Sequence, residues 1–239
     1  MNNQFAGLID DLRATHGKNL ASVILYGSAA TNDFVKSHSD YNLLIALHEI
    51  TPQELRNAQA PMREWNRLGH PIPVYFTVNE LETAADVFPI EFYQMERARK
   101  ILYGADVLAT IAISDENLRH QTEYELRSKL ILLRRHYIPV STSVSGLTNL
   151  MAESLASFAT LFRAVLMLRG IEPPIGKHKI VAATAQHLQL DGAVFEKIFN
   201  IRGNNYAPAL DEVSANRLFA DYMAQIEKVI GAVDDLETS

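Results

Sequence analysis

The chain has 239 residues, of which 48% are hydrophobic and 21% charged, an ordinary composition for a folded globular protein. Its formal net charge is −6, and this acidic balance argues against broad nucleic-acid binding, which needs an excess of Lys and Arg. Because the chain has no cysteine, disulfides, thiolate metal ligands and cysteine nucleophiles are excluded.

The sequence predicts neither a secretory signal nor a membrane span. Residues Met1 to Gln4 carry no basic stretch followed by an apolar run, as a signal peptide would. The longest apolar segment, Leu155 to Leu168, contains Arg163 and is too short and too polar to cross a bilayer. We therefore expect a cytoplasmic protein with no membrane partner.

The first hundred residues alternate between helical and strand patterns. Apolar residues at helical spacing predict a first helix that ends at Gly17. Short apolar runs predict four strands, at 21–26, 41–47, 71–77 and 100–103. The third of these contains prolines, which cannot donate to a ladder, so we expect it near a sheet edge.

Two helical segments are expected between these strands. The first spans 51–68, where Thr51 caps the start and Pro52 occupies the first helical position. The second spans 79–97 and is interrupted at Pro89.

Beyond about residue 115 the pattern predicts helices throughout. The expected segments are 116–137, 148–169, 177–188, 193–201 and 215–236. The second of these is apolar on nearly every face, so we expect it at the centre of a bundle. The change of pattern predicts two domains, 1–110 and 111–239. The fold class is then α+β, with a small mixed sheet and flanking helices followed by an all-α bundle.

The most informative stretch joins two of the predicted strands. It reads LYGSAA from Leu25 and SDYNLL from Ser39. Gly27 allows a tight turn and a close backbone approach to a ligand, and Ser28 with the N–H groups of a helix start can hold a phosphate. Asp40, at the start of the next strand, can reach a divalent ion bound to that phosphate. Residues two apart on a strand share a face, so Asp40 and Asn42 are expected to face the same site.

This stretch resembles the signature of the DNA polymerase β-type nucleotidyltransferase superfamily, including its aminoglycoside, lincosamide and minimal members. The resemblance covers about 25 residues, and the element order around them agrees to about residue 104. It implies that Gly27, Ser28 and Ser39 bind the nucleotide, ATP or another NTP, and that Asp40 ligates Mg²⁺. The implied partners are that nucleotide and a small-molecule or protein acceptor.

The sequence departs from the superfamily pattern at two of the acidic positions. Asn42 stands at the second acid position and offers a neutral carbonyl oxygen as a metal ligand. The third acid, expected within 74–77, is absent from that run, VYFT. Some aminoglycoside-type members take a base from the helical domain, and the lone acid Glu153 is the matching candidate here. Glu91 is a second candidate base.

Several interpretations stay open from the sequence. The protein is an enzyme transferring a nucleoside monophosphate, a nucleotide-binding protein without catalysis, or a helical interaction module in which residues 116–236 do the work. Exposed apolar surface and self-association would support the third, and a homo-oligomer is one expected partner. Asp40 is also explained as a capping residue, and Glu153 as an exposed residue or a partner of Arg134. The basic run from Lys177 to Lys179 fits either an anion contact or a solvated helix face.

Overall fold

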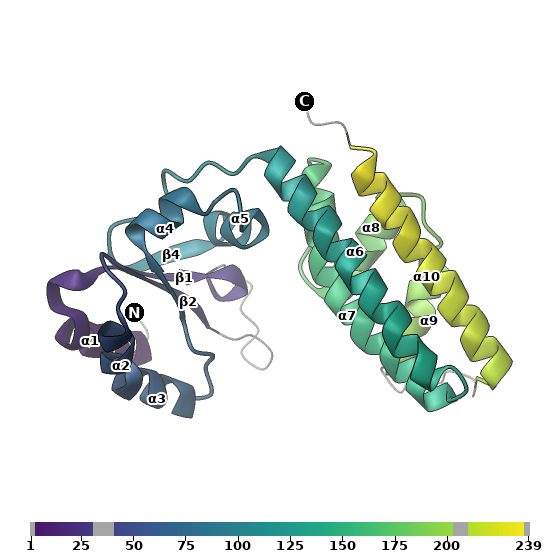
Figure 1. The fold of residues 1–239 in the computed structure, drawn as a ribbon, viewed down its shortest axis with the longest axis horizontal. Coiled ribbons are helices and arrows are strands. Elements are labelled where there is room, and N and C mark those ends of the chain that lie inside the picture. Colours follow the sequence, from purple (N-terminus) through teal and green to yellow (C-terminus); the bar gives the residue numbers. More distant parts are fainter. Residues whose placement is uncertain (1–2, 31–40, 203–209, 237–239) are drawn as a thin grey trace. The chain divides into compact units, whose positions relative to one another are not determined.

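The computed structural model describes residues 3–30, 41–202 and 210–236. The chain divides into two compact units, Met1–Ser114 and Asp115–Ser239, which are described in turn (Figure 1). Within the described residues, the first unit contains the sheet and the second consists of helices and their connections. This is the α+β architecture that the sequence predicts.

A mixed sheet forms the centre of the first unit. Its strands are β1 (Leu20–Tyr26), β2 (Asn42–Leu47), β3 (Val74–Thr77) and β4 (Arg99–Gly104), in the order β3-β2-β1-β4. β1 pairs antiparallel with both β2 and β4, whereas β2 and β3 are parallel. β3 is an edge strand, as its prolines predict, and Pro73 stands just before the strand rather than inside it.

Helices cover both faces of this sheet. They are α1 (Asn3–His16), α2 (Pro52–Asn57) and α3 (Gln59–Arg67) on one side, and α4 (Val78–Thr83) and α5 (Pro89–Arg97) on the other (Figure 1). Successive strand residues point to opposite faces. Leu43 and Ile45 therefore pack in the α1–α3 core, and Leu44 and Ala46 in the α4–α5 core. Burial on both faces explains why β2 is a continuous apolar run.

The single helix expected over 51–68 is wrong, because the chain forms two helices there. α2 ends at Asn57 and α3 begins at Gln59. Pro61 has no N–H to donate to the carbonyl of Asn57, four residues earlier, and its ring would clash with that carbonyl. The start is as predicted, since the Thr51 side chain accepts a hydrogen bond from the Glu54 N–H.

The second unit is a bundle of long and short helices. They are α6 (Asp115–Val140), α7 (Val144–Leu168), α8 (Lys177–His187), α9 (Gly192–Arg202) and α10 (Glu212–Asp234). α7 packs against all four of the others, which confirms the expectation that the most apolar helix is central. Leu155, Phe158 and Phe162 are among its fully buried residues.

The connection between the helices expected at 116–137 and 148–169 is shorter than predicted. α6 continues through Pro139 to Val140, and α7 begins at Val144. The Ser143 hydroxyl accepts a hydrogen bond from the Gly146 N–H at 3.1 Å, so Ser143 is the capping residue that starts α7.

α7 is also the one helix among the described residues that is long and apolar enough to cross a membrane. It spans 25 residues, more than the segment from Leu155 that the sequence picked out. Half of its most apolar window is buried inside the bundle, and the core helix of a soluble protein passes the same test. Its composition follows from its place at the centre of four helices.

Candidate nucleotide site

β1 ends in a tight turn at one end of the sheet. Gly27 has φ 77°, in the left-handed region that favours glycine. Its N–H donates to the carbonyl of Ala98 and its carbonyl accepts from the N–H of Ala30, both at 2.9 Å. The second bond closes the short helical turn η2 (Gly27–Ala29). The backbone is therefore held in a conformation that a side chain at position 27 would strain.

Asn42 lies beside this turn. It is the first residue of β2 and pairs with Tyr26, the last residue of β1. Its amide nitrogen is 3.5 Å from the position that a Cβ on Gly27 would occupy. The antiparallel register thus brings the glycine turn and the second acid position of the resemblance to the same end of the sheet.

Three of the predicted site residues are described only in part or not at all. Ser39 and Asp40 belong to residues 31–40, which lie outside the described residues. Ser28 is the middle residue of η2, so its backbone belongs to the turn. The roles expected for Ser28, Ser39 and Asp40 stay predictions.

β3 brings no carboxylate to this end of the sheet. Its sequence is VYFT, and its parallel pairing with β2 begins at Leu44 and Val74. Tyr75 packs in the α1–α3 core. Phe76 faces the opposite core, where its ring centre is 5.7 Å from that of Phe92. The third acid of the resemblance therefore has no counterpart on this strand.

A carboxylate reaches this neighbourhood from α5 instead. α5 packs against both β1 and η2, and Glu91 lies in its first turn. Burial raises the pKa of the Tyr26 phenol above its usual value, and the negative charge of Glu91 raises that pKa further. Glu91 is thus close enough to act electrostatically on the residue that precedes Gly27 and pairs with Asn42.

Glu153, the other candidate base, belongs to the second unit. It lies on α7 with an exposed side chain, whereas Gly27 belongs to the first unit. The partner considered for it from the sequence, Arg134, pairs with Glu227 of α10 at 2.7 Å. Glu153 is therefore an exposed residue, as one of its two alternative explanations predicts, and the pairing with Arg134 is wrong.

An ion pair that was not expected from the sequence lies on the other side of β1. Arg99 pairs with Tyr26 in the β1–β4 ladder. Its Nε and Nη2 donate to the Asp106 carboxylate at 3.0 to 3.1 Å, and its Nη1 donates to the carbonyl of Glu96 at 2.6 Å. Arg99 therefore ties the end of α5 and the segment after β4 to the strand beside Tyr26. In the sequence, this pair is marked only by an arginine and an aspartate seven residues apart, on either side of Gly104.

The described residues at this end of the sheet offer few oxygen ligands for magnesium. Among the described residues, no group of three His, Asp or Glu side chains lies close enough to hold a metal. Mg²⁺ normally keeps several waters and uses one or two carboxylates together with substrate phosphates. The Asn42 side chain offers one oxygen ligand among the described residues, and Asp40, which lies outside them, stays a predicted ligand. A pair of ions needs more carboxylates than the second and third positions supply.

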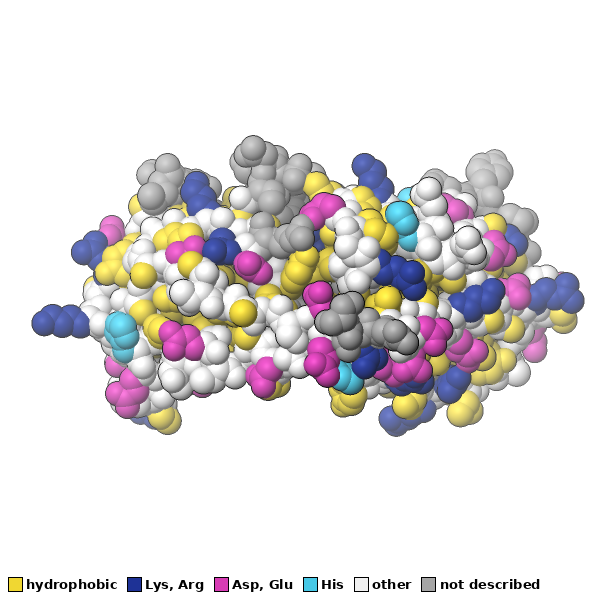
Figure 2. Space-filling view, turned by 90° about the horizontal axis from the view of Figure 1, so that it is seen from above, with side chains coloured by type: hydrophobic (Ala, Val, Ile, Leu, Met, Phe, Trp, Pro, Cys, Tyr) yellow, Lys and Arg dark blue, Asp and Glu magenta, His cyan; other side chains and the backbone are white. Residues whose placement is uncertain are grey.

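The surface carries both signs of charge. On the face shown in Figure 2, Lys and Arg side chains are interspersed with Asp and Glu. Nucleic-acid binding normally uses a continuous basic stripe or patch, and this face presents none in its described residues.

The comparisons with known proteins identify the fold. No family model matches the chain, and no curated protein matches its sequence. Its structure is similar to the crystal structure of the spectinomycin adenyltransferase AAD(9) from Enterococcus faecialis with ATP and spectinomycin. The TM-score is 0.59 at 14% sequence identity, over 98% of this chain and 99% of that one. This chain therefore has the fold of a nucleotidyltransferase.

Proposed function

We propose that this protein binds a nucleoside triphosphate and Mg²⁺ at the Gly27 turn and transfers a nucleoside monophosphate to a hydroxyl of a small-molecule acceptor. The observation that carries the proposal is the side chain of Asn42 lying against the left-handed Gly27 turn, in a nucleotidyltransferase fold. The similar adenyltransferase was crystallised with ATP and spectinomycin, which supports ATP as the nucleotide and a small molecule as the acceptor.

Each residue of the site has a chemical task in this proposal. The N–H groups of the η2 turn and the amide of Asn42 donate to phosphate oxygens. Asp40 would hold a magnesium ion, and that ion would supply positive charge to neutralise the triphosphate. The acceptor hydroxyl attacks the α-phosphorus, the bond to the β-phosphate oxygen breaks, and pyrophosphate leaves. The hydroxyl proton passes to a carboxylate base, for which Glu91 is the candidate in the same unit as Gly27.

Transfer of label from ATP tests this reaction. The protein is incubated with α-labelled ATP, Mg²⁺ and a panel of hydroxyl-bearing acceptors that includes aminocyclitols and aminoglycosides. We expect the wild type and Asp33→Ala to label an acceptor, and Asp40→Ala to lose labelling. Asp33 is the matched control, since it is an acid in the same connection between β1 and β2. Equal labelling by the wild type and Asp40→Ala would defeat the role proposed for Asp40.

A second candidate function is nucleotide binding without transfer. It is favoured by the neutral Asn42 at the site and by the acid-free β3. A nucleotide present at 100 times its dissociation constant stabilises the folded state by about 2.7 kcal/mol. Thermal stabilisation by Mg·ATP, with no label transferred to any acceptor in the panel, would support binding alone. Labelling of an acceptor would reject it.

A further inference from the structure

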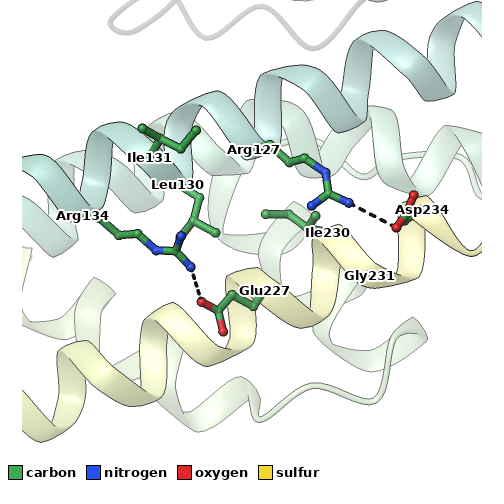
Figure 3. A pocket seen from close by; sticks show the side chains of 8 residues that line it. All are labelled: Arg127, Leu130, Ile131, Arg134, Glu227, Ile230, Gly231 and Asp234. Carbon is green, nitrogen blue, oxygen red and sulfur yellow. Dashed lines mark hydrogen bonds and ion pairs between the residues drawn. The ribbon is translucent and has the colours of Figure 1, made fainter.

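α6 and α10 run antiparallel along the surface of the second unit and enclose a groove of about 440 Å³ (Figure 3). Two ion pairs bridge the groove. The Arg127 Nη2 is 3.1 Å from the Asp234 carboxylate, and the Arg134 Nη2 is 2.7 Å from the Glu227 carboxylate. Figure 3 shows both arginines reaching from α6 toward the acids of α10. One wall of the groove is therefore cationic and the other anionic, and on both walls the charges are seven residues apart.

The floor between the two ion pairs is apolar and has an open space. Leu130 and Ile230 lie between the pairs and are 6% and 4% exposed. Gly231 also lines the groove, and a Cβ added to it would meet no atom within 4 Å. The centre of the groove can thus accept an incoming apolar side chain.

The outer faces of the two helices carry matching patterns of large and small residues. On α6, Tyr124, Ile131 and Ile138 are 69%, 57% and 73% exposed and are seven residues apart, so they form one stripe. On α10, exposed Ala224 and partly exposed Gly231 are small residues at the same spacing. A large apolar stripe thus runs beside a row of small residues.

We propose that this face binds a second copy of the chain about a two-fold axis parallel to α6 and α10. A rotation about such an axis places α6 of one protomer against α10 of the other. It leaves the position of each residue along the axis unchanged. Because Arg127 lies opposite Asp234, and Arg134 opposite Glu227, Ile131 of one protomer then lies over Gly231 of its partner. Ile138, two turns further along, lies over the partner's Ala224. The apolar stripe of each protomer thus packs on the small residues of the partner's α10, as an isologous interface requires.

Charge selects this arrangement over the alternative axis. With the parallel axis, the arginines of α6 lie over the acids of the partner's α10, so opposite charges face each other across the interface. Arg127 also pairs with Glu123, one turn earlier on α6, at 2.7 Å, and the other pair of the face is Arg134 with Glu227. An axis perpendicular to the helices would place Arg127 over the partner's Arg134, and like charges facing each other are unfavourable. The apolar stripe and the charges therefore point to the same dimer.

The face is large enough for a specific but modest dimer. Helices of 23 and 26 residues are about 35 Å long or more, and two of them side by side are about 20 Å wide. A face of roughly 700 Å² results, close to the about 800 Å² per partner of a standard interface. Exposed isoleucines are costly in water, and burying them supplies the driving force.

Sedimentation or light scattering on the full chain over a range of concentrations tests the proposal. We expect the wild type to reach twice the chain mass of 26.7 kDa. Ile131→Glu should be monomeric, because it puts a charge over the partner's Gly231. Ile175→Glu is the matched control, since Ile175 is 55% exposed and precedes α8, away from the α6–α10 face. This control should stay dimeric. A monomeric wild type at all concentrations, or equal dissociation of the two variants, would overturn the proposal.

A charge exchange tests the geometry without relying on any one variant. Arg127→Glu with Arg134→Glu makes the face wholly acidic, and Glu227→Arg with Asp234→Arg makes it wholly basic. Each double variant alone should be folded by circular dichroism, because exposed ion pairs contribute little to stability, and monomeric by sedimentation. An equimolar mixture should form a one-to-one heterodimer. A mixture that stays monomeric would reject the proposed stacking of α6 on the partner's α10.

Discussion

The amide nitrogen of Asn42 stands 3.5 Å from the point that a Cβ on Gly27 would take. The β1–β2 register fixes this proximity, because Asn42 pairs with Tyr26 and Tyr26 directly precedes the turn. A ligand that lies against the Gly27 backbone must therefore also meet the Asn42 side chain. The relationship places the glycine and the amide within reach of one ligand, and each can be tested separately.

Replacement of Gly27 should damage both stability and binding. We expect Gly27→Ala to lower the free energy of unfolding by about 1–2 kcal/mol, since an L-residue pays this in the left-handed region. It should also weaken binding of Mg·ATP, because the new methyl group fills the space beside the Asn42 amide that a bound phosphate would occupy. Gly17→Ala is the control: its φ is 53° and its Cβ would meet no atom within 4 Å. Denaturant unfolding and calorimetric titration should show a similar stability loss for both variants and a binding loss for Gly27→Ala alone.

Restoring the acid at position 42 should strengthen metal-dependent binding. Asn42→Asp adds a carboxylate beside the Gly27 turn, where the proposed Mg²⁺ would need oxygen ligands. We expect Mg·ATP to bind about tenfold more tightly, a change of about 1.4 kcal/mol. ATP titrated with excess chelator should bind the variant more weakly than the wild type, since the new charge then repels the phosphates. Identical affinities with and without magnesium would argue against a metal ion near residue 42.

The sheet could be predicted from the sequence because its signals are local. The apolar run of β2 and the glycine after β1 each have one simple structural meaning, and both elements form where expected. The break between α2 and α3 was missed, although Pro61 carries its cause in the sequence. The break follows from the missing N–H of Pro61, which leaves the Asn57 carbonyl without its helical donor. A count of apolar positions does not reveal this.

The candidate site could be predicted only where it depends on strand register. The spacing of Gly27 and Asn42 is enough to place both at one end of two neighbouring strands. The approach of Glu91 to Tyr26, by contrast, depends on how α5 packs against β1, and the bond between Arg99 and Asp106 depends on the path after β4. Those contacts are set by tertiary packing, which leaves no periodic trace in the sequence.

Removal of the Glu91 charge should lower the pKa of Tyr26. Burial is the larger cause of the raised pKa, so Glu91→Gln should move it only part of the way toward its usual value near 10. Stability from a raised pKa is present below the unfolded value and lost as pH rises through the folded one. The variant should therefore show a smaller change in stability per pH unit above about pH 10.

Ring-labelled tyrosine followed by NMR during an alkaline titration measures this shift, with Tyr26→Phe identifying the signal. Glu82→Gln is the control, an exposed acid on α4 whose charge is not among the causes of the Tyr26 shift. If Glu91 also serves the nucleotide site, Glu91→Gln should change the affinity for Mg·ATP, whereas Glu82→Gln should not. An unchanged Tyr26 titration in Glu91→Gln would show that the two groups do not interact.

Removal of the Tyr75 hydroxyl should stabilise the first unit. The Tyr75 hydroxyl and the Nε2 of His16 are both buried and have no hydrogen-bond partner among the described residues, although the Nδ1 of His16 lies 2.6 Å from Glu54. A buried polar group without a partner costs about 1–3 kcal/mol. We therefore expect Tyr75→Phe to raise the free energy of unfolding by about 1 kcal/mol.

Tyr222→Phe is the matched control in the second unit. The Tyr222 hydroxyl is buried but hydrogen-bonded to the Ser154 hydroxyl at 3.1 Å, so its removal should lower the free energy of unfolding by about 1 kcal/mol. Urea unfolding of both variants gives the comparison. A loss of stability in Tyr75→Phe as well would mean that the Tyr75 hydroxyl has a hydrogen-bond partner. A water molecule that bridges it to His16 Nε2 would be the first candidate. The opposite signs expected for two buried tyrosines follow from the hydrogen bond alone, because both substitutions remove the same atom.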